Sequence, residues 1–284
     1  MPEPDRTALG RRLALGAVVL VALIVLAVVI ARGRPAPEPS PEPAVPPPTP
    51  ATNAVEVVPQ PLPLPTPPLG RKGLIEAVGR AASAYSAGVP VADSDKELVG
   101  QRFRIGIPFG CGGPAGENPK GFVYWTRDAG SKVIRLVAKP QDWTKAAWAQ
   151  ALGGDGEYEA IEGFWLPRPW TASQACAPGL EATAGERTLA LAMFFEPGSS
   201  RVLQRSGRPY EHVLNAPDGE APIAPKGYRL MLEGRITGFP DGQAIRCRAE
   251  GANTRPVCMI AVRFEDVSFE DPVSGSTLAE WRNN

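Results

Sequence analysis

The chain has 284 residues, of which 43% are hydrophobic and 33 are proline, and its formal net charge is zero. The apolar residues and the prolines are concentrated in separate N-terminal segments, which excludes a single soluble domain and a protein with many membrane spans. The charge balance excludes a strongly basic nucleic-acid binder, because a neutral domain releases few counterions on binding.

The first element is an uncharged apolar run from Leu13 to Ile30. As a helix, its ~18 residues span about 27 Å, close to the hydrocarbon thickness of a bilayer. The alternative is a cleaved signal peptide, but this run is longer than a usual signal core and residues 31–34 offer no small-residue cleavage site. We expect a short cytoplasmic tail over 1–12 and a single transmembrane helix over 13–31.

A proline-rich linker follows over residues 32–69. Proline fixes the backbone dihedral φ and removes amide donors, so neither a helix nor a sheet interior forms there. We expect a polyproline II spacer in its proline-dense part, residues 35–68, with a contour of up to about 105 Å at ~3.1 Å per residue. The alternative is a ligand for a proline-recognition domain.

The order of anchor, proline spacer and C-terminal domain resembles the layout of TonB-like and other envelope-spanning bacterial proteins. The resemblance is one of layout and covers residues 1–68, so no energy-transducing function is transferred. The short N-terminal tail and the cysteine usage favour an oxidising compartment for the large C-terminal part. We therefore expect a single-pass inner-membrane protein with a cytoplasmic N-terminus and a periplasmic domain.

Residues 70–284 are predicted to form a mainly β domain, an antiparallel meander or sandwich with one or two accessory helices. Helical spacing predicts a helix over 73–87, and Asp142 is expected to cap a short helix that runs through Ala151. Strands are predicted over 102–107, 122–125, 133–137, 163–166, 189–195, 229–236, 244–249 and 257–269.

The chain has four cysteines. If Cys247 faces Cys258 in an antiparallel hairpin, Ile245 opposes Ile260 on the same buried face, which supports this pairing. Cys111 and Cys176 then form the second disulfide. No Cys-x-x-Cys is present and the single histidine is remote in sequence, so we expect no metal and no cofactor.

The glycine-rich segment around Cys111 has three interpretations. Cys111 could be a nucleophile with His212 as its base. The segment could instead be a dinucleotide loop, but Pro114 prevents the helix that must receive the pyrophosphate. We favour the third interpretation, a loop tied by a disulfide to Cys176.

Two acidic clusters could supply paired carboxylates for glycoside cleavage or ligands for calcium, although solvated strand faces and turns are the expected role. The clusters are Asp155, Glu157, Glu159 and Glu162, and then Glu265, Asp266, Glu270 and Asp271.

A segment of aromatic residues and prolines is the candidate binding patch. Such rings on loops stack on sugars or anchor a partner protein, but we favour the interpretation that they cap the edge of a core. The residues of this patch are Phe164, Trp165, Pro167, Pro169 and Trp170.

The sequence contains no complete catalytic set. We therefore expect a non-catalytic interaction or scaffold domain, with the membrane as its anchor and an envelope protein or glycan as its partner. The alternative is an envelope hydrolase that cleaves cell-wall or polysaccharide substrates through the carboxylates or through Cys111 and His212.

Overall fold

The computed structural model describes residues 66–284 apart from 120, 128–132, 155, 168, 170, 177–186, 200–202, 216–223 and 284. All described residues belong to one compact unit, Pro63–Asn284. The predicted tail, transmembrane helix and most of the proline-rich linker lie outside the described residues. Among the described helices, none is both long enough and apolar enough to cross a bilayer.

The described part of the chain is mainly β with accessory helices, which confirms the predicted class. In chain order its elements are α2 (Arg71–Ala87), α3 (Asp93–Lys96), β1 (Arg102–Phe109), β2 (Val123–Arg127), β3 (Ile134–Ala138), β4 (Gln141–Asp142), α4 (Ala147–Gly153), β5 (Ala160–Trp165), β6 (Leu189–Phe195), β7 (Tyr210–Leu214), β8 (Tyr228–Ile236), β9 (Ile245–Arg248), β10 (Val257–Glu270) and β11 (Thr277–Arg282).

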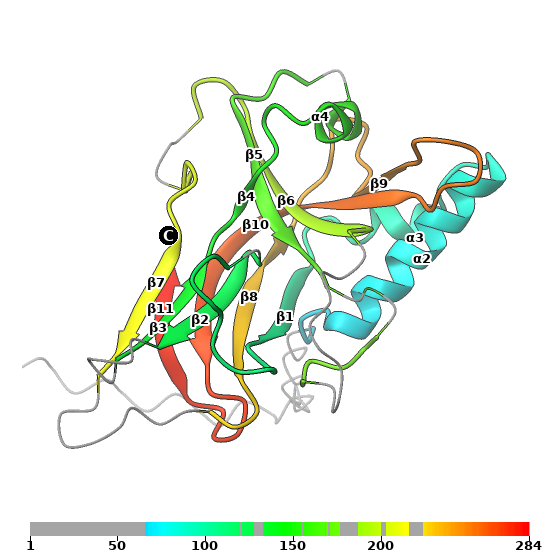
Figure 1. Cartoon of the computed structure of the whole chain (residues 1–284). Coiled ribbons are helices and arrows are strands. Elements are labelled where there is room, and N and C mark those ends of the chain that lie inside the picture. The colour runs from blue at the N-terminus through cyan, green and yellow to red at the C-terminus, as the bar shows by residue number, and fades with distance from the viewer. Residues whose placement is uncertain are drawn as a thin grey trace, which may run out of the picture. The chain divides into compact units, whose positions relative to one another are not determined.

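The strands form two sheets (Figure 1). The larger sheet has the order β1-β8-β10-β6-β5-β4, with β9 and β11 paired to β10, and the smaller sheet has the order β2-β3-β7. The first half of β10 pairs with β6 and β9, and its second half pairs with β8 and β11. The pair β10–β6 is parallel, which departs from the antiparallel prediction. The long connection through β7, β8 and β9 allows this, because only a long crossover can join parallel neighbours.

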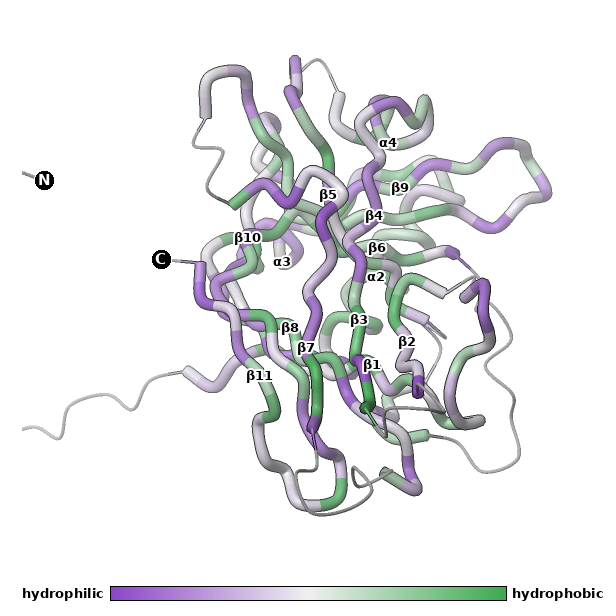
Figure 2. Tube along the Cα trace, turned by 60° about the vertical axis from the view of Figure 1, so that its left-hand side comes forward, coloured by the Kyte–Doolittle hydropathy of each residue, from purple (hydrophilic) through white to green (hydrophobic). Residues whose placement is uncertain are grey.

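The two sheets share one hydrophobic core. Trp125 of the smaller sheet meets Tyr228 of the larger one edge to face, with ring centroids 5.8 Å apart. Tyr210 of β7 meets Trp281 of β11 in the same way at 5.3 Å. In Figure 2 the strands carry the hydrophobic stretches, whereas many connecting loops are hydrophilic. The sheets therefore form two layers around one core.

A bulge in β10 allows this strand to pair with both halves of the larger sheet. The register against β8 shifts between Phe264 and Asp266. A Cβ atom on Gly234 would lie 2.0 Å from the carbonyl oxygen of Arg263, so glycine is needed where the two strands approach this closely.

Helix α2 follows the predicted spacing closely. Leu74, Ala77 and Ala81 are buried on one face. Gly88 ends the helix with φ +66°, a left-handed conformation that glycine adopts without strain. The chain then turns into Val89 and Pro90.

Helix α4 is shorter than predicted and begins later. Residues 141–142 pair with β5 as the short strand β4, so they are not available to start a helix. The Asp142 carboxylate accepts the backbone N–H of Thr144 at 2.9 Å, so it holds the turn before α4 instead of its first residue. On the sheet face under α4, a second hydrophobic cluster contains Trp143, Leu152 and Trp165.

Candidate functional site

The two predicted disulfides are present. Cys111 bonds to Cys176 with their Cα atoms 5.5 Å apart, and Cys247 bonds to Cys258 with their Cα atoms 4.0 Å apart. In the β9–β10 pair Ile245 opposes Ile260, so the predicted register is confirmed. The short Cα separation of Cys247 and Cys258 is typical of residues that face each other without sharing backbone hydrogen bonds.

The disulfide removes Cys111 as a nucleophile. Its sulfur is bonded to Cys176, so no thiolate is available for the predicted alternative with His212. His212 lies on β7 opposite Leu136 of β3. The loop around Cys111 is instead packed around Trp125, whose indole N–H donates to the carbonyl of Gly110 at 3.4 Å. The glycine-rich segment is therefore a disulfide-tied loop, as predicted.

The first acidic cluster does not form a carboxylate pair among the described residues. Glu162 is buried with 3% of its surface exposed. Its carboxylate accepts the backbone N–H groups of Arg205 at 2.8 Å and Ser206 at 2.7 Å. Glu159 accepts the backbone N–H of Gly198 at 3.4 Å. These two acidic side chains hold loops in place.

The second acidic cluster lies in a network of ion pairs on the larger sheet. Arg104 of β1 bridges Glu233 and Glu270 at 2.8 and 2.9 Å. Glu265 pairs with Arg235 at 2.8 Å. Arg104 and Glu233 lie on the adjacent strands β1 and β8, and Arg235 and Glu265 lie on the adjacent strands β8 and β10, whereas Glu270 of β10 lies one strand further from Arg104. These ion pairs therefore join three strands across the sheet.

Asp266 has the most perturbed carboxyl group in this network. Burial, followed by a hydrogen bond with Glu280 and the negative charges of Glu280 and Glu233, raises the pKa of Asp266 to about 6. Arg282 lies 3.7 Å away and opposes this shift. Asp266 lies on β10 and Glu280 lies on β11, so both carboxyl groups belong to the β10–β11 hairpin. Across these two strands Asp266 is directly opposite Arg282.

The two described rings of the candidate binding patch lie inside the domain. Phe164 is 1% exposed and belongs to the core between the sheets, whereas Trp165 is 9% exposed and belongs to the cluster under α4. They point in opposite directions because successive side chains alternate across a strand. Pro167 and Pro169 are half-buried, and Trp170 lies outside the described residues.

A buried arginine ties this patch to the start of α2. The Arg71 side chain donates to the backbone carbonyl of Thr171 at 2.8 Å and to that of Pro167. Burial lowers the pKa of Arg71 to about 10. The backbone of the patch therefore anchors a helix end, and its two described rings fill cores, which agrees with the favoured core-edge interpretation of this segment.

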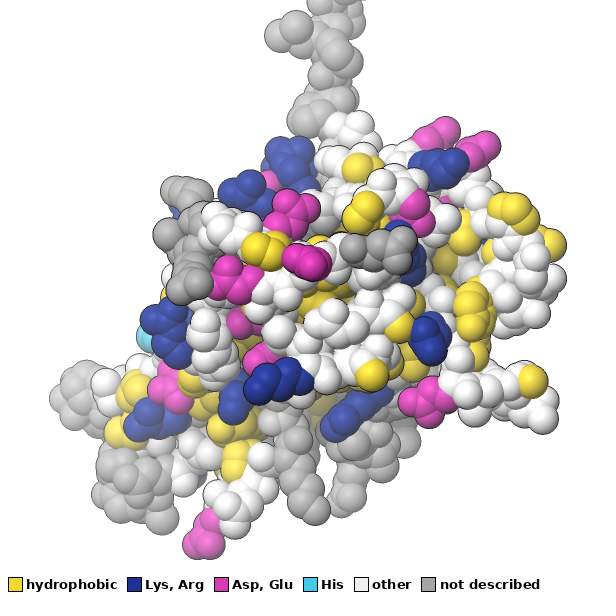
Figure 3. Space-filling view, turned by 90° about the horizontal axis from the view of Figure 1, so that it is seen from above, with side chains coloured by type: hydrophobic (Ala, Val, Ile, Leu, Met, Phe, Trp, Pro, Cys, Tyr) yellow, Lys and Arg dark blue, Asp and Glu magenta, His cyan; other side chains and the backbone are white. Residues whose placement is uncertain are grey.

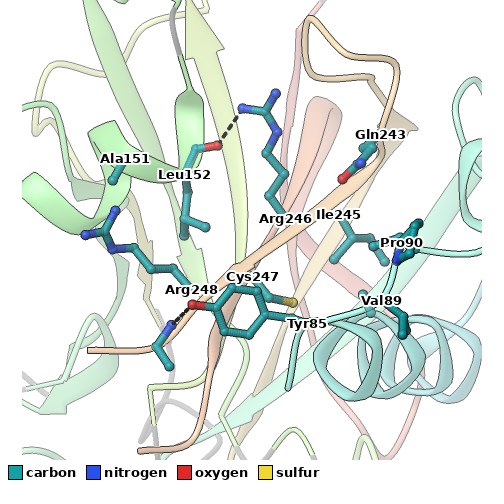
Figure 4. Close-up of a pocket in the computed structure, with 13 residues that line it drawn as sticks. Tyr85, Val89, Pro90, Ala151, Leu152, Gln243, Ile245, Arg246, Cys247 and Arg248 are labelled. Atoms are coloured by element: carbon teal, nitrogen blue, oxygen red, sulfur yellow. Dashed lines mark hydrogen bonds between the residues drawn. The ribbon is translucent and has the colours of Figure 1, made fainter. Parts of the chain in front are cut away.

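A groove of about 480 Å³ lies where α2, α4 and β9 meet (Figure 4). Tyr85, Val89 and Pro90 line it from the end of α2 and the turn after it, while Ala151 and Leu152 line it from α4. Strand β9 runs through the groove between these two walls. The volume falls in the range of about 300–1,000 Å³ that is usual for ligand sites.

The outer edge of β9 faces this groove. The N–H of Ala261 donates to the carbonyl of Ala244 at 3.1 Å, so Ala244 faces β10. Because backbone groups alternate along a strand, Ile245, Cys247 and Ala249 direct their N–H and C=O groups away from β10. The N–H of Ala249 indeed donates to the hydroxyl of Tyr85 at 3.1 Å.

Among the described strands, β9 pairs with β10 alone, so its outer edge carries backbone groups without strand partners. Such an edge is a template for another extended chain.

The groove carries positive charge. Arg246 and Arg248 line it, and no acidic side chain lines it among the residues that the structure describes. Arg246 is held inside the protein, because it donates to the carbonyl of Leu152 at 2.9 Å and pairs with Asp241 at 3.0 Å. Arg248 is exposed and makes no ion pair within the part of the chain that the structure describes.

Elsewhere the charges are mixed. On the face seen from above in Figure 3, acidic and basic side chains are interspersed with hydrophobic ones, so this face has no large area of one sign. Within the described ranges, no group of three or more possible metal ligands lies together.

Sequence patterns did not identify the groove, although its parts were visible. The alternation of Arg246 and Arg248 with Ile245 and Cys247 indicated a strand with one charged face. Helical spacing places Tyr85 on the apolar face of α2 with Leu74 and Ala81, yet it is 41% exposed at the groove. Nothing in the sequence placed the ends of α2 and α4 on the two sides of β9.

Comparison with known protein families, curated proteins and solved structures finds no match to this chain.

Proposed function

We propose that this chain is a single-pass envelope protein of bacterial type that presents a non-catalytic interaction domain in the periplasm. The expected transmembrane helix over 13–31 supplies the anchor, and the proline-rich segment over 32–69 supplies a spacer. The two disulfides support the choice of an oxidising compartment. An envelope protein is the proposed partner.

The observation that carries the binding role is the groove at the outer edge of β9. It combines unpaired strand backbone, exposed apolar walls at Tyr85 and Val89, and an exposed arginine at Arg248. Proteins commonly protect sheet edges by covering them or by placing charges on them. An open edge flanked by two helices is suited to receive a partner segment.

The topology can be tested by fusing two reporters in turn after Asn284, one active only in the periplasm and the other active only in the cytoplasm. We expect activity from the periplasmic reporter, and we expect the full-length chain to remain in the membrane fraction after carbonate washing. Activity of the cytoplasmic reporter would overturn the proposed location. Release of a shortened chain into the periplasm would show a cleaved signal peptide in place of an anchor.

A further inference from the structure

The charge and shape of the groove restrict what it can bind. A strand that pairs with the outer edge of β9 continues the sheet, so its side chains alternate between the two faces of that sheet. On one face the partner residues meet the side of Arg246 and Arg248, next to α4. On the other face they meet the side of Tyr85 and Val89, next to α2 (Figure 4).

The two sides of the groove favour different side chains in the partner segment. Arg248 is exposed and has no acidic partner among the described residues, so an acidic side chain placed beside it gains an ion pair. Tyr85 and Val89 are 41% and 54% exposed, so apolar side chains placed beside them bury surface that water now covers.

We infer that the outer edge of β9 binds an extended acidic segment of a partner protein by strand addition. Acidic residues of that segment lie beside Arg248, and the apolar residues between them lie beside Tyr85 and Val89. Its backbone exchanges hydrogen bonds with Ile245 and Cys247, whose N–H and C=O groups point into the groove. This inference rests on the proposed interaction role and specifies the site and the ligand for it.

Binding can be measured with the full-length chain in detergent micelles and a synthetic peptide of about eight residues that alternates Glu with Val, long enough to cover β9 and its flanks. We expect saturable binding of this peptide. A peptide with Lys in place of Glu, and one with Pro at alternate positions, are expected to bind at least about tenfold more weakly, because they lose the charge match or the backbone donors.

Two substitutions test the assigned sides of the groove. We expect Arg248→Glu and Val89→Asp each to weaken binding of the Glu–Val peptide by about tenfold or more. Arg187→Glu and Val273→Asp are the matched controls, because both residues are exposed and do not line the groove. The inference is overturned if binding is the same in all four variants, or if the Lys peptide binds as well as the Glu peptide.

Hydrogen exchange distinguishes strand addition from a contact of side chains alone. On binding of the Glu–Val peptide, the amide hydrogens of Ile245 and Cys247 should exchange at least about tenfold more slowly, since they gain partners. Those of Arg246 and Arg248 already face β10 and should change less. Binding without slower exchange at Ile245 and Cys247 would overturn strand addition.

The outcomes separate this inference from the proposed function. If the peptide fails to bind while the reporter experiment places the domain in the periplasm, strand addition at β9 is wrong and the proposed location stands. If the peptide binds and slows amide exchange in β9 while the C-terminus lies in the cytoplasm, strand addition at β9 is supported and the proposed location is wrong.

Discussion

Glu162 illustrates why a charged residue in an acidic cluster need not be catalytic. Its carboxylate is almost completely buried and is bonded to two successive backbone N–H groups, of Arg205 and Ser206. Ser206 has φ 51°, a left-handed conformation that costs energy for a residue other than glycine. The two hydrogen bonds offset the cost of burying the Glu162 carboxylate, and they hold Ser206 in its strained conformation.

Glu162→Gln should therefore destabilise the protein without changing its shape. The amide keeps the size of the side chain but loses the negative charge and offers one acceptor oxygen in place of two. We expect the free energy of unfolding to fall by about 2 kcal/mol, as measured by denaturant titration. Glu157→Gln, at an exposed position, is the control. Equal stability of the two variants would show that Glu162 does not anchor the loop.

Asp266 should make stability depend on pH. Its pKa is raised to about 6 in the folded chain, above the value of about 4 expected in the unfolded chain, so the folded state binds more protons between these two values. Stability from this group is therefore lost as the pH rises from 4 to above 6. The loss is about 1 kcal/mol after discounting for solvent screening.

Asp266→Asn removes this titration. The stability of the variant relative to the native chain should rise by about 1 kcal/mol between pH 4 and pH 7, measured by denaturant titration at each pH. Glu117→Gln, at an exposed position, serves as the control. A relative stability of Asp266→Asn that falls over this range would contradict the assigned direction of the shift.

At the scale of elements, each disulfide closes a loop of different length. Cys247 and Cys258 are 11 residues apart in sequence, and Cys111 and Cys176 are 65 apart. The loop-entropy model gives about 3 kcal/mol for the first and about 4 kcal/mol for the second. The first also fixes β9 against β10 and therefore holds one edge of the groove.

We expect Cys247→Ser with Cys258→Ser to lower the free energy of unfolding by about 3 kcal/mol and to speed amide exchange of Arg246 and Arg248, which face β10. Replacing Cys111 and Cys176 by serine should cost about as much or more in stability but leave the exchange in β9 almost unchanged. Equal effects of the two double variants on β9 would show that the hairpin does not depend on its own disulfide.

The sequence predicted the β9–β10 pairing because alternation and the two cysteines constrained the same register. It predicted α2 because Leu74, Ala77 and Ala81 recur at helical spacing. It did not predict β7 or β11. β7 reads Tyr-Glu-His-Val-Leu with no turn signal of its own, and only Tyr210 in it is fully buried. Such half-exposed strands depend on their neighbours more than on their own pattern.

The groove could be predicted only in part, because it is assembled from three segments that are distant in sequence. Its walls come from residues around 85–90 and 151–152, and its edge comes from 245–249. Periodicity within each segment says which residues are buried, but not which segments meet. The aromatic segment at Phe164 and Trp165 was easier to interpret, since the favoured core-edge interpretation needs only that these rings be buried, and they fill two cores.

At the scale of the whole molecule, the proposal joins three parts with different mechanical roles. An anchor fixes the chain to the membrane, a proline-rich spacer sets its reach, and a disulfide-bonded β domain offers the edge of β9 to a partner. In this proposal the tether keeps the domain near envelope proteins, so that a modest affinity at the groove is enough for binding. The central claim is that this edge is the surface that the partner contacts.

Photo-crosslinking in intact membranes shows whether the partner contacts this edge. A photoreactive residue is placed at Val89 in the groove or, as the control, at Val273 in a turn outside it. We expect one product specific to Val89, which mass spectrometry maps to an extended acidic segment of an envelope protein. This product should be lost when Arg248→Glu is also present. The same products from both positions, or a Val89 product that Arg248→Glu leaves unchanged, would contradict the claim that the partner contacts this edge.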